Sequence, residues 1–134
     1  MSGPGGTTTR QRGDAAEDLA LAHLQAQGLR LVRRNFRTPG RGGGEIDLIM
    51  REPDGTLVFV EVRQRVSSRA GGAAASVTVA KQRRIVFAAR HFLLQCRSEP
   101  PCRFDVVVID GALGAGQPPR LEWLRAAFDA GASF

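Results

Sequence analysis

The sequence predicts a single α/β domain in which a mixed sheet is flanked by helices, with elements in the order αβββαββ. Three observations predict this class. The chain of 134 residues is long enough for one domain and too short for two ordinary ones. Its apolar fraction of 43% is close to that of globular proteins. Segments with helical periodicity also alternate with shorter segments that have strand character.

The first half of the chain is expected to form a helix followed by three strands. Residues Arg10 to Gln27 have the periodicity of a helix, and Gly28 is a typical stop signal. The apolar stripe of this helix comprises Ala16, Leu19, Ala20, His23 and Leu24. The strands are expected at Leu29–Arg37, Glu45–Arg51 and Thr56–Arg63, with a loop at Pro39–Gly44. Pro53-Asp54-Gly55 suits a hairpin turn, because proline presets φ and glycine takes the left-handed position.

The second half is expected to add a helix and two strands. A loop over residues 66–76 leads to a helix from about Thr78 to Gln95, whose apolar stripe is Ile85, Ala88, Ala89, Phe92 and Leu93. Phe104–Ile109 has the strongest pattern of a buried strand, and a last strand near Arg120–Leu124 precedes a short helical turn at Arg125–Ala130. Residues 1–9 are expected to be a disordered tail, which leaves 10–130 as the domain.

The register of the hairpin brings two carboxylates together. Centring the turn on Asp54 places Asp47 opposite Glu61 and Ile49 opposite Phe59. The even positions of both strands are all apolar and predict a face packed on a helix: Ile46, Leu48, Met50, Val58, Val60 and Val62. The other face then holds Asp47 and Glu61 with their Cβ atoms about 4.5–5.5 Å apart.

Two opposed carboxylates repel each other and reduce stability, so a sequence selected only for folding would usually avoid this arrangement. A divalent cation removes the repulsion, because Mg²⁺ binds carboxylate oxygens and retains waters. The alternative is a solvent-facing strand pair that Arg63 and Arg51 neutralise.

The charge distribution favours a polyanionic partner. The net charge is +6, and residues 29–44 contain five arginines and no acid, while residues 63–98 contain eight cations and no acid. Such segregation makes a positive surface field that suits nucleic acid. The alternative is a solvated basic surface without a partner. The arginines expected to contact nucleic acid are Arg34, Arg37, Arg65, Arg83 and Arg84.

The sequence also indicates a compartment. No uncharged apolar run approaches the roughly 18 residues that cross a bilayer, and the first residues lack the apolar region of a secretory signal. We therefore expect a cytoplasmic protein without a membrane partner. Cys96 and Cys102 lack the paired spacing of a zinc site and are interpreted as structural or incidental.

The motifs resemble a known family. The spacing Asp47…Glu61-Val62-Arg63 resembles the PD-(D/E)xK signature of restriction-endonuclease-like nucleases. A wider set of motifs over residues 10–128 resembles the bacterial YraN-like family: Gly13-Asp-Ala-Ala-Glu17, Gly28, Arg34-Asn-Phe-Arg37, Gly44-Glu-Ile-Asp-Leu-Ile49, Val58-Phe-Val-Glu-Val-Arg63, Val77…Lys81-Gln-Arg-Arg-Ile85 and Arg103-Phe-Asp-Val106. The resemblance implies a single restriction-endonuclease-like domain that acts as a metal-dependent endonuclease.

The resemblance also implies roles for individual residues. Asp47 and Glu61 would bind Mg²⁺ or Mn²⁺. Glu17 matches the helical glutamate that completes the acidic cluster in similar archaeal Holliday-junction resolvases, or is a solvated helix charge. Glu45 either joins these ligands or pairs with Arg63.

The sequence departs from the nuclease pattern at Arg63, which replaces the usual lysine. Arginine is a poor general base because it stays protonated, although it can hold a phosphate with two hydrogen bonds. Lys81, the only lysine, either supplies the missing ammonium or is a phosphate contact or surface charge. The function expected is hydrolysis of nucleic-acid phosphodiester bonds on DNA, with branched or damaged DNA among the candidate substrates. The alternative is a catalytically weak or inactive nucleic-acid-binding module. The sequence reveals no oligomer interface.

Overall fold

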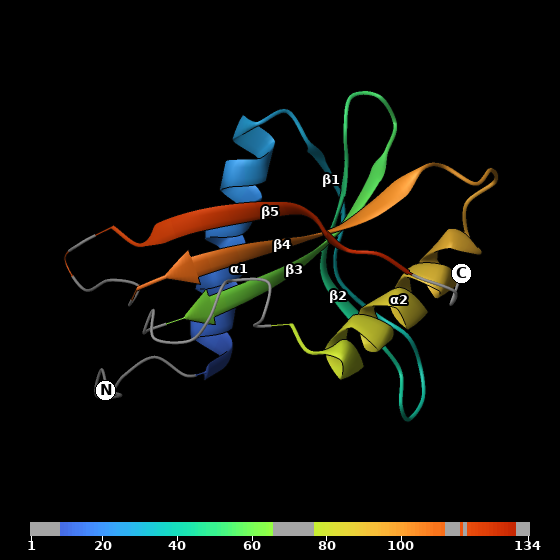
Figure 1. Cartoon of the computed structure of the whole chain (residues 1–134), viewed down its shortest axis with the longest axis horizontal. Coiled ribbons are helices and arrows are strands. Elements are labelled where there is room, and N and C mark those ends of the chain that lie inside the picture. The colour runs from blue at the N-terminus through green and yellow to red at the C-terminus, as the bar shows by residue number, and fades with distance from the viewer. Residues whose placement is uncertain (1–8, 66–76, 112–115, 117, 131–134) are drawn as a thin grey trace, which may run out of the picture.

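A computed structural model of the chain describes residues 9–65, 77–111, 116 and 118–130 (Figure 1). The elements are α1 (Thr9–Ala26), β1 (Arg30–Arg37), β2 (Glu45–Arg51), β3 (Leu57–Arg65), α2 (Val79–Leu93), β4 (Cys102–Asp110) and β5 (Arg120–Phe128). The mixed α/β class and the order αβββαββ are therefore confirmed. The predicted tail, apart from Thr9 where α1 begins, and the predicted loop at 66–76 lie outside the described residues. Within them, no helix is long and apolar enough to span a membrane.

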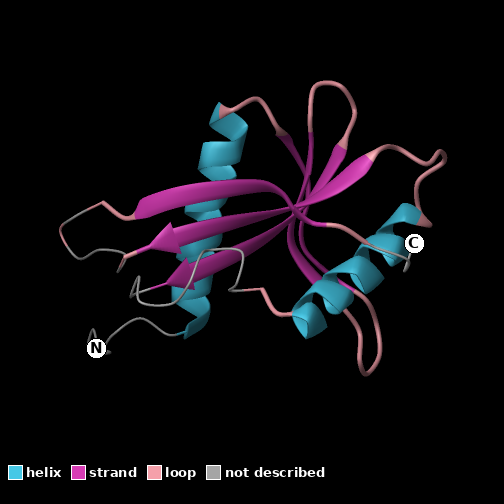
Figure 2. Cartoon of the chain, viewed as in Figure 1, coloured by secondary structure: helices cyan, strands magenta, loops and turns pink. Residues whose placement is uncertain are grey.

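The five strands form one twisted sheet in the order β1-β2-β3-β4-β5 (Figure 2). Neighbouring strands are antiparallel except β3 and β4, which are parallel. Two parallel neighbours require a crossover, and α2 supplies it. In Figure 1, α1 crosses behind strands β3 to β5.

Both faces of the central strands are buried, one under each helix. The even positions Leu48, Met50, Val58 and Val60 pack with α1, as the alternation predicts. The opposite positions, with Ile49 and Phe59, pack under the apolar side of α2. Ile46, expected on the same face as these even positions, belongs to the cluster under α2. The hairpin therefore has no open face, and its two carboxylates lie at the end of a buried strand pair.

The helices present most of the faces that their periodicity predicts. Ala16, Ala20 and Leu24 are buried in α1, whereas Leu19 is 39% exposed. In α2 the buried residues are Ile85, Val86, Ala88, Ala89 and Phe92, and Leu93 is partly buried against them.

The helical turn predicted at Arg125–Ala130 is wrong, because β5 continues to Phe128. The strand is irregular here: Ala126 has a positive φ of 49°, and the pairing of β4 with β5 shifts between Phe104 and Val106. The Ala126 N–H donates to Oδ1 of Asp105 at 2.9 Å, and Phe128 stacks on Phe104. A bulge interrupts the alternation of a strand, which explains why residues 125–130 do not have a strand pattern.

Candidate functional site

The two hairpin carboxylates lie where β2 and β3 separate. The predicted register is confirmed for Ile49 and Phe59, and the pairing ends with Leu48 and Val60. Beyond that pair, Oδ2 of Asp47 accepts a hydrogen bond from the Val62 N–H at 2.8 Å. The Asp47 side chain thus replaces a backbone hydrogen bond between the two strands. This hydrogen bond holds Asp47 beside Glu61.

Glu61 is a buried acid with an incomplete set of partners. The residue is 3% exposed, and among the residues that the structure describes its Oε1 has no hydrogen-bond partner. Two cations lie near Oε2: Nζ of Lys81 at 3.6 Å and Nη1 of Arg63 at 3.8 Å. Burial, and after it the charge of Asp47, raises the pKa of Glu61 to about 8. A buried carboxylate oxygen without a partner is unfavourable unless a cation or a proton satisfies it.

Asp47 shares this environment. Burial raises its pKa, and the bond from the Val62 N–H acts in the opposite direction. The effect on the pair is one-sided: Asp47 raises the pKa of Glu61, whereas a side-chain interaction with Glu61 lowers the pKa of Asp47. A proton shared by the pair therefore resides on Glu61, because two like charges cannot both ionise cheaply in a desolvated site.

Local structure places the lysine. Thr78 is the N-cap of α2, and its Oγ1 accepts from the Lys81 N–H at 3.1 Å. This cap fixes Lys81 in the first turn. Gly44, just before β2, lies so close to α2 that a Cβ there would overlap the carbonyl oxygen of Arg84. The start of β2 is thus held against the first turns of α2, which brings Asp47 and Lys81 to the same place.

The other two acids of the predicted metal set are held by arginines. Glu17 on α1 accepts from Nε of Arg34 at 3.2 Å, and the same guanidinium reaches Asp18 at 2.7 Å. Burial and the charge of Asp47 raise the pKa of Glu17, so it is near the pair. Oε2 of Glu45 accepts from Nε of Arg37 at 3.1 Å, whereas Arg63 approaches Glu61. In the described part of the chain, no three His, Cys, Asp or Glu side chains are grouped closely enough to hold a metal ion.

The predicted nucleic-acid contacts fall into two groups. Arg34, Arg37 and Arg65 have carboxylate partners, and Arg65 binds Asp110 with bonds of 2.6 and 2.9 Å. Arg83 and Arg84 are exposed on α2, and no carboxylate among the described residues pairs with them. The second group is better placed to contact a phosphate backbone.

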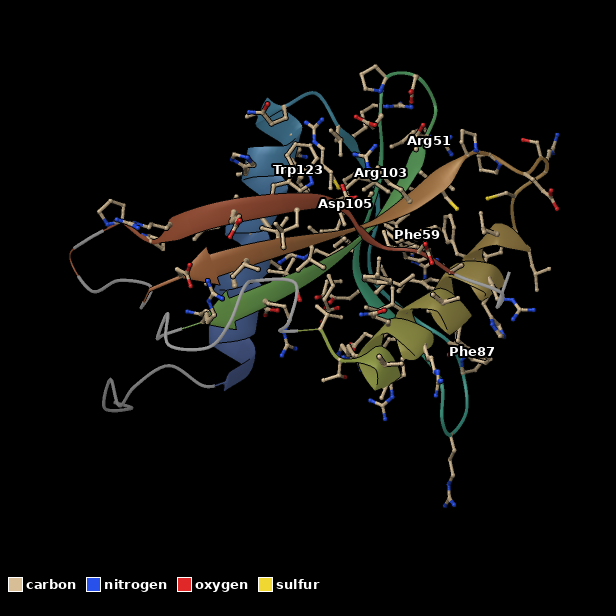
Figure 3. All side chains as sticks on the ribbon, in the orientation of Figure 1. Arg51, Phe59, Phe87, Arg103, Asp105 and Trp123 are labelled. Atoms are coloured by element: carbon tan, nitrogen blue, oxygen red, sulfur yellow. The ribbon has the colours of Figure 1, made fainter. Side chains whose placement is uncertain are left out.

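A second polar cluster surrounds Asp105 and was not anticipated (Figure 3). Asp105 is fully buried and accepts from Nε of Arg103 at 3.0 Å and from Nε1 of Trp123 at 2.9 Å. Arg103 also binds Glu52. With the Ala126 N–H, these bonds satisfy the carboxylate and fix the bulge of β5 on β4. The signal in the sequence is the single acid within the apolar run Phe104–Ile109.

The amino-acid sequence matches the model of a protein family. The model of "Uncharacterised protein family UPF0102" matches residues 16–109. The chain belongs to family UPF0102. The YraN-like resemblance is thereby confirmed at the level of the family.

Its relatives cover nearly the whole chain. A UPF0102 protein of Polaromonas naphthalenivorans is 64% identical over 129 residues, which cover 95% of this chain and 84% of the relative. A UPF0102 protein of Paracidovorax citrulli is 65% identical over 134 residues, which cover 97% of this chain and 94% of the relative. One from Acidovorax sp. is 67% identical over 123 residues, covering 92% and 88%.

Proposed function

We propose that the protein is a divalent-metal-dependent endonuclease that hydrolyses phosphodiester bonds of DNA. The observation that carries this proposal is the pair of desolvated carboxylates, Asp47 and Glu61, in which Oε1 of Glu61 is buried without a hydrogen-bond partner in the described part of the chain. The resemblance to PD-(D/E)xK nucleases, and to their restriction-endonuclease-like fold, supports the same assignment.

The residues present fit a hydrated Mg²⁺ or Mn²⁺ ion. Magnesium binds to one or two carboxylates and keeps several waters, so Asp47 and Glu61 suffice as protein ligands. Glu17 would become a third ligand only by leaving Arg34, and Glu45 only by leaving Arg37. When bound, such an ion lowers the pKa of a water and stabilises the charge of a phosphoryl transition state.

The chain's own cations have roles that follow from their positions. Lys81, whose ammonium lies 3.6 Å from Glu61, is placed to favour the ionised carboxylate or to bind the scissile phosphate. It thus provides the ammonium that Arg63 does not. Arg63 can hold a phosphate oxygen pair with its planar guanidinium. Arg83 and Arg84 would contact neighbouring phosphates, which positions DNA without reading its sequence.

A second candidate is a nucleic-acid-binding module with weak or no catalysis. Arg63 in the lysine position favours it, because arginine stays protonated and cannot act as a general base. Both candidate functions include binding to nucleic acid, but only the endonuclease requires a bound metal ion.

Calorimetric titration tests the proposal. Mn²⁺ and Mg²⁺ are titrated into chelator-treated wild type, Asp47→Asn and the control Asp54→Asn, with and without uncleavable duplex DNA. Asp54 is an exposed acid at the far end of the same hairpin. We expect saturable binding by wild type and by Asp54→Asn, and its loss in Asp47→Asn. The same proteins are then assayed for cleavage of single-stranded, duplex and branched DNA.

The outcomes separate the two candidates. Metal binding and cleavage that both require Asp47 support the endonuclease. If no protein binds metal even with DNA present, while Arg83→Ala with Arg84→Ala abolishes DNA binding, the binding module is correct. A control pair of exposed arginines, Arg30→Ala with Arg97→Ala, removes the same charge elsewhere. Loss of two duplex phosphate contacts would reduce the log–log salt slope by about 1.8.

A further inference from the structure

The outer face of α2 carries an exposed basic and aromatic stripe. Arg83, Phe87, Arg90 and Leu94 follow the helical spacing of one face, turned away from the buried side of the helix. Phe87 is 42% exposed and Leu94 is 83% exposed. The ring of His91 lies 4.6 Å from the ring of Phe87. Figure 3 shows Phe87 beside α2. An exposed phenylalanine that contacts a histidine ring at a tilt of 50° and is flanked by arginines does not contribute to the core.

A groove adjoins this stripe. It has a volume of about 590 Å³ and lies between the later turns of α2 and the segment before β4. Its lining residues are Phe87, Arg90, His91, Leu93, Leu94, Glu99, Pro100 and Cys102. Glu99 is the one acid among these residues, and Arg90 and His91 are the basic ones. The groove therefore combines apolar walls with a few polar side chains, and the excess of positive charge lies on the stripe beside it.

The positive charge of α2 indicates which kind of molecule could bind to this stripe and groove. The helix contains no acid, and Lys81, Arg83 and Arg84 lie in its first two turns. Cations near a helix N-terminus are unfavourable, because the N-terminal end of the dipole is already positive. A bound polyanion would relieve this repulsion. A second copy of the chain related by twofold symmetry would instead place this acid-free helix against the same positive surface of the partner, because both copies contribute the same patch.

We propose that the outer face of α2 and its groove bind single-stranded nucleic acid, with a base stacked on Phe87 and phosphates held by Arg83 and Arg90. Aromatic faces stack on any base, and nearby arginines track the backbone. This inference rests on the proposed function and deepens it. Phe87 follows Lys81 by six residues, about 9 Å along the helix axis. The same six residues turn the helix by about 240°, so a strand on this stripe reaches the acidic pair by passing around the first turns of α2. The substrate class is then DNA with a single-stranded segment beside the cleavage point.

Binding to an unstructured oligonucleotide tests the inference without metal. Fluorescence anisotropy with a labelled oligothymidine of about 15 nucleotides is measured in EDTA, and an oligouridine of equal length distinguishes DNA from RNA. We expect Phe87→Ala to weaken binding roughly 5- to 100-fold. Leu19→Ala, which removes an exposed apolar side chain from α1, is the matched control and should bind as wild type. Arg90→Ala should reduce the salt slope by about 0.7.

A conservative variant adds a direct readout of stacking. Phe87→Trp should keep the affinity, and oligonucleotide should quench its extra fluorescence relative to the Trp123 emission of wild type. Wild-type affinity in Phe87→Ala, or no quenching in Phe87→Trp, would overturn the inference. A Phe87→Ala protein that changes from dimer to monomer while keeping its oligonucleotide affinity would also overturn it. Because no metal is present, these results are independent of the Asp47→Asn titration that tests the proposed function.

Discussion

Replacing Glu61 by glutamine should remove a pH-dependent loss of stability. The carboxyl has a pKa of 4.5 in the unfolded chain and about 8 in the folded protein. Between these values the folded state binds more protons than the unfolded state, so the free energy of unfolding falls as pH rises. Below pH 4.5 both states are protonated, and above pH 8 both are ionised, so the effect is confined to this window. Each pH unit inside it lowers stability by up to about 1.4 kcal/mol.

Thermal unfolding of chelator-treated protein measures this effect. From about pH 5 to pH 8 the expected loss is on the order of 4 kcal/mol, which is roughly 10–15 °C in Tm for a chain of this size. Glu61→Gln should lose most of this slope, since its neutral side chain also relieves Asp47, and it should be more stable than wild type at pH 8. Asp54→Asn should keep the slope. Equal slopes in wild type and Glu61→Gln would refute the assignment of Glu61 as a destabilised acid.

Three further substitutions test the packing around the site by urea unfolding. Gly44→Ala should destabilise by about 2–3 kcal/mol, because its Cβ would overlap the Arg84 carbonyl oxygen. Gly13→Ala, in α1 with no atom near its Cβ, should instead stabilise by up to about 1 kcal/mol. Asp105→Asn should destabilise by about 3 kcal/mol, since Arg103 would lose its buried charge partner.

The fold was predictable where a single periodicity decides the structure. The alternation of the hairpin correctly assigned Leu48, Met50, Val58 and Val60 to a helix-covered face, and it gave the register of Ile49 with Phe59. It did not reveal that α2 covers the other face. A strand that is buried on both faces is apolar at nearly every position, whereas a half-buried strand is apolar at every second position. The acids at the ends of this strand pair made its sequence look like the half-buried kind.

The candidate site was less predictable, because its geometry depends on contacts between distant segments. The sequence brings Asp47 and Glu61 to one hairpin, but it does not show that Arg34 holds Glu17 or that Lys81 reaches Glu61. These contacts connect β1 with α1 and α2 with β3. The bulge at Ala126 was missed for a similar reason, since its hydrogen-bond acceptor is Asp105 on another strand.

Two electrostatic features of this fold are unfavourable for folding alone, and they lie side by side. Glu61 has an unsatisfied buried oxygen, and α2 begins with cations at the positive end of its dipole. Lys81 connects them, since it contacts Glu61 and belongs to the same first turn as Thr78. A divalent cation would relieve the first feature and a phosphate backbone the second. A nucleic acid bound with its metal supplies both, so the protein–metal–DNA complex should be more stable than the sum of the separate binding free energies predicts. Calorimetry measures this coupling as a tighter Mn²⁺ dissociation constant in the presence of uncleavable DNA.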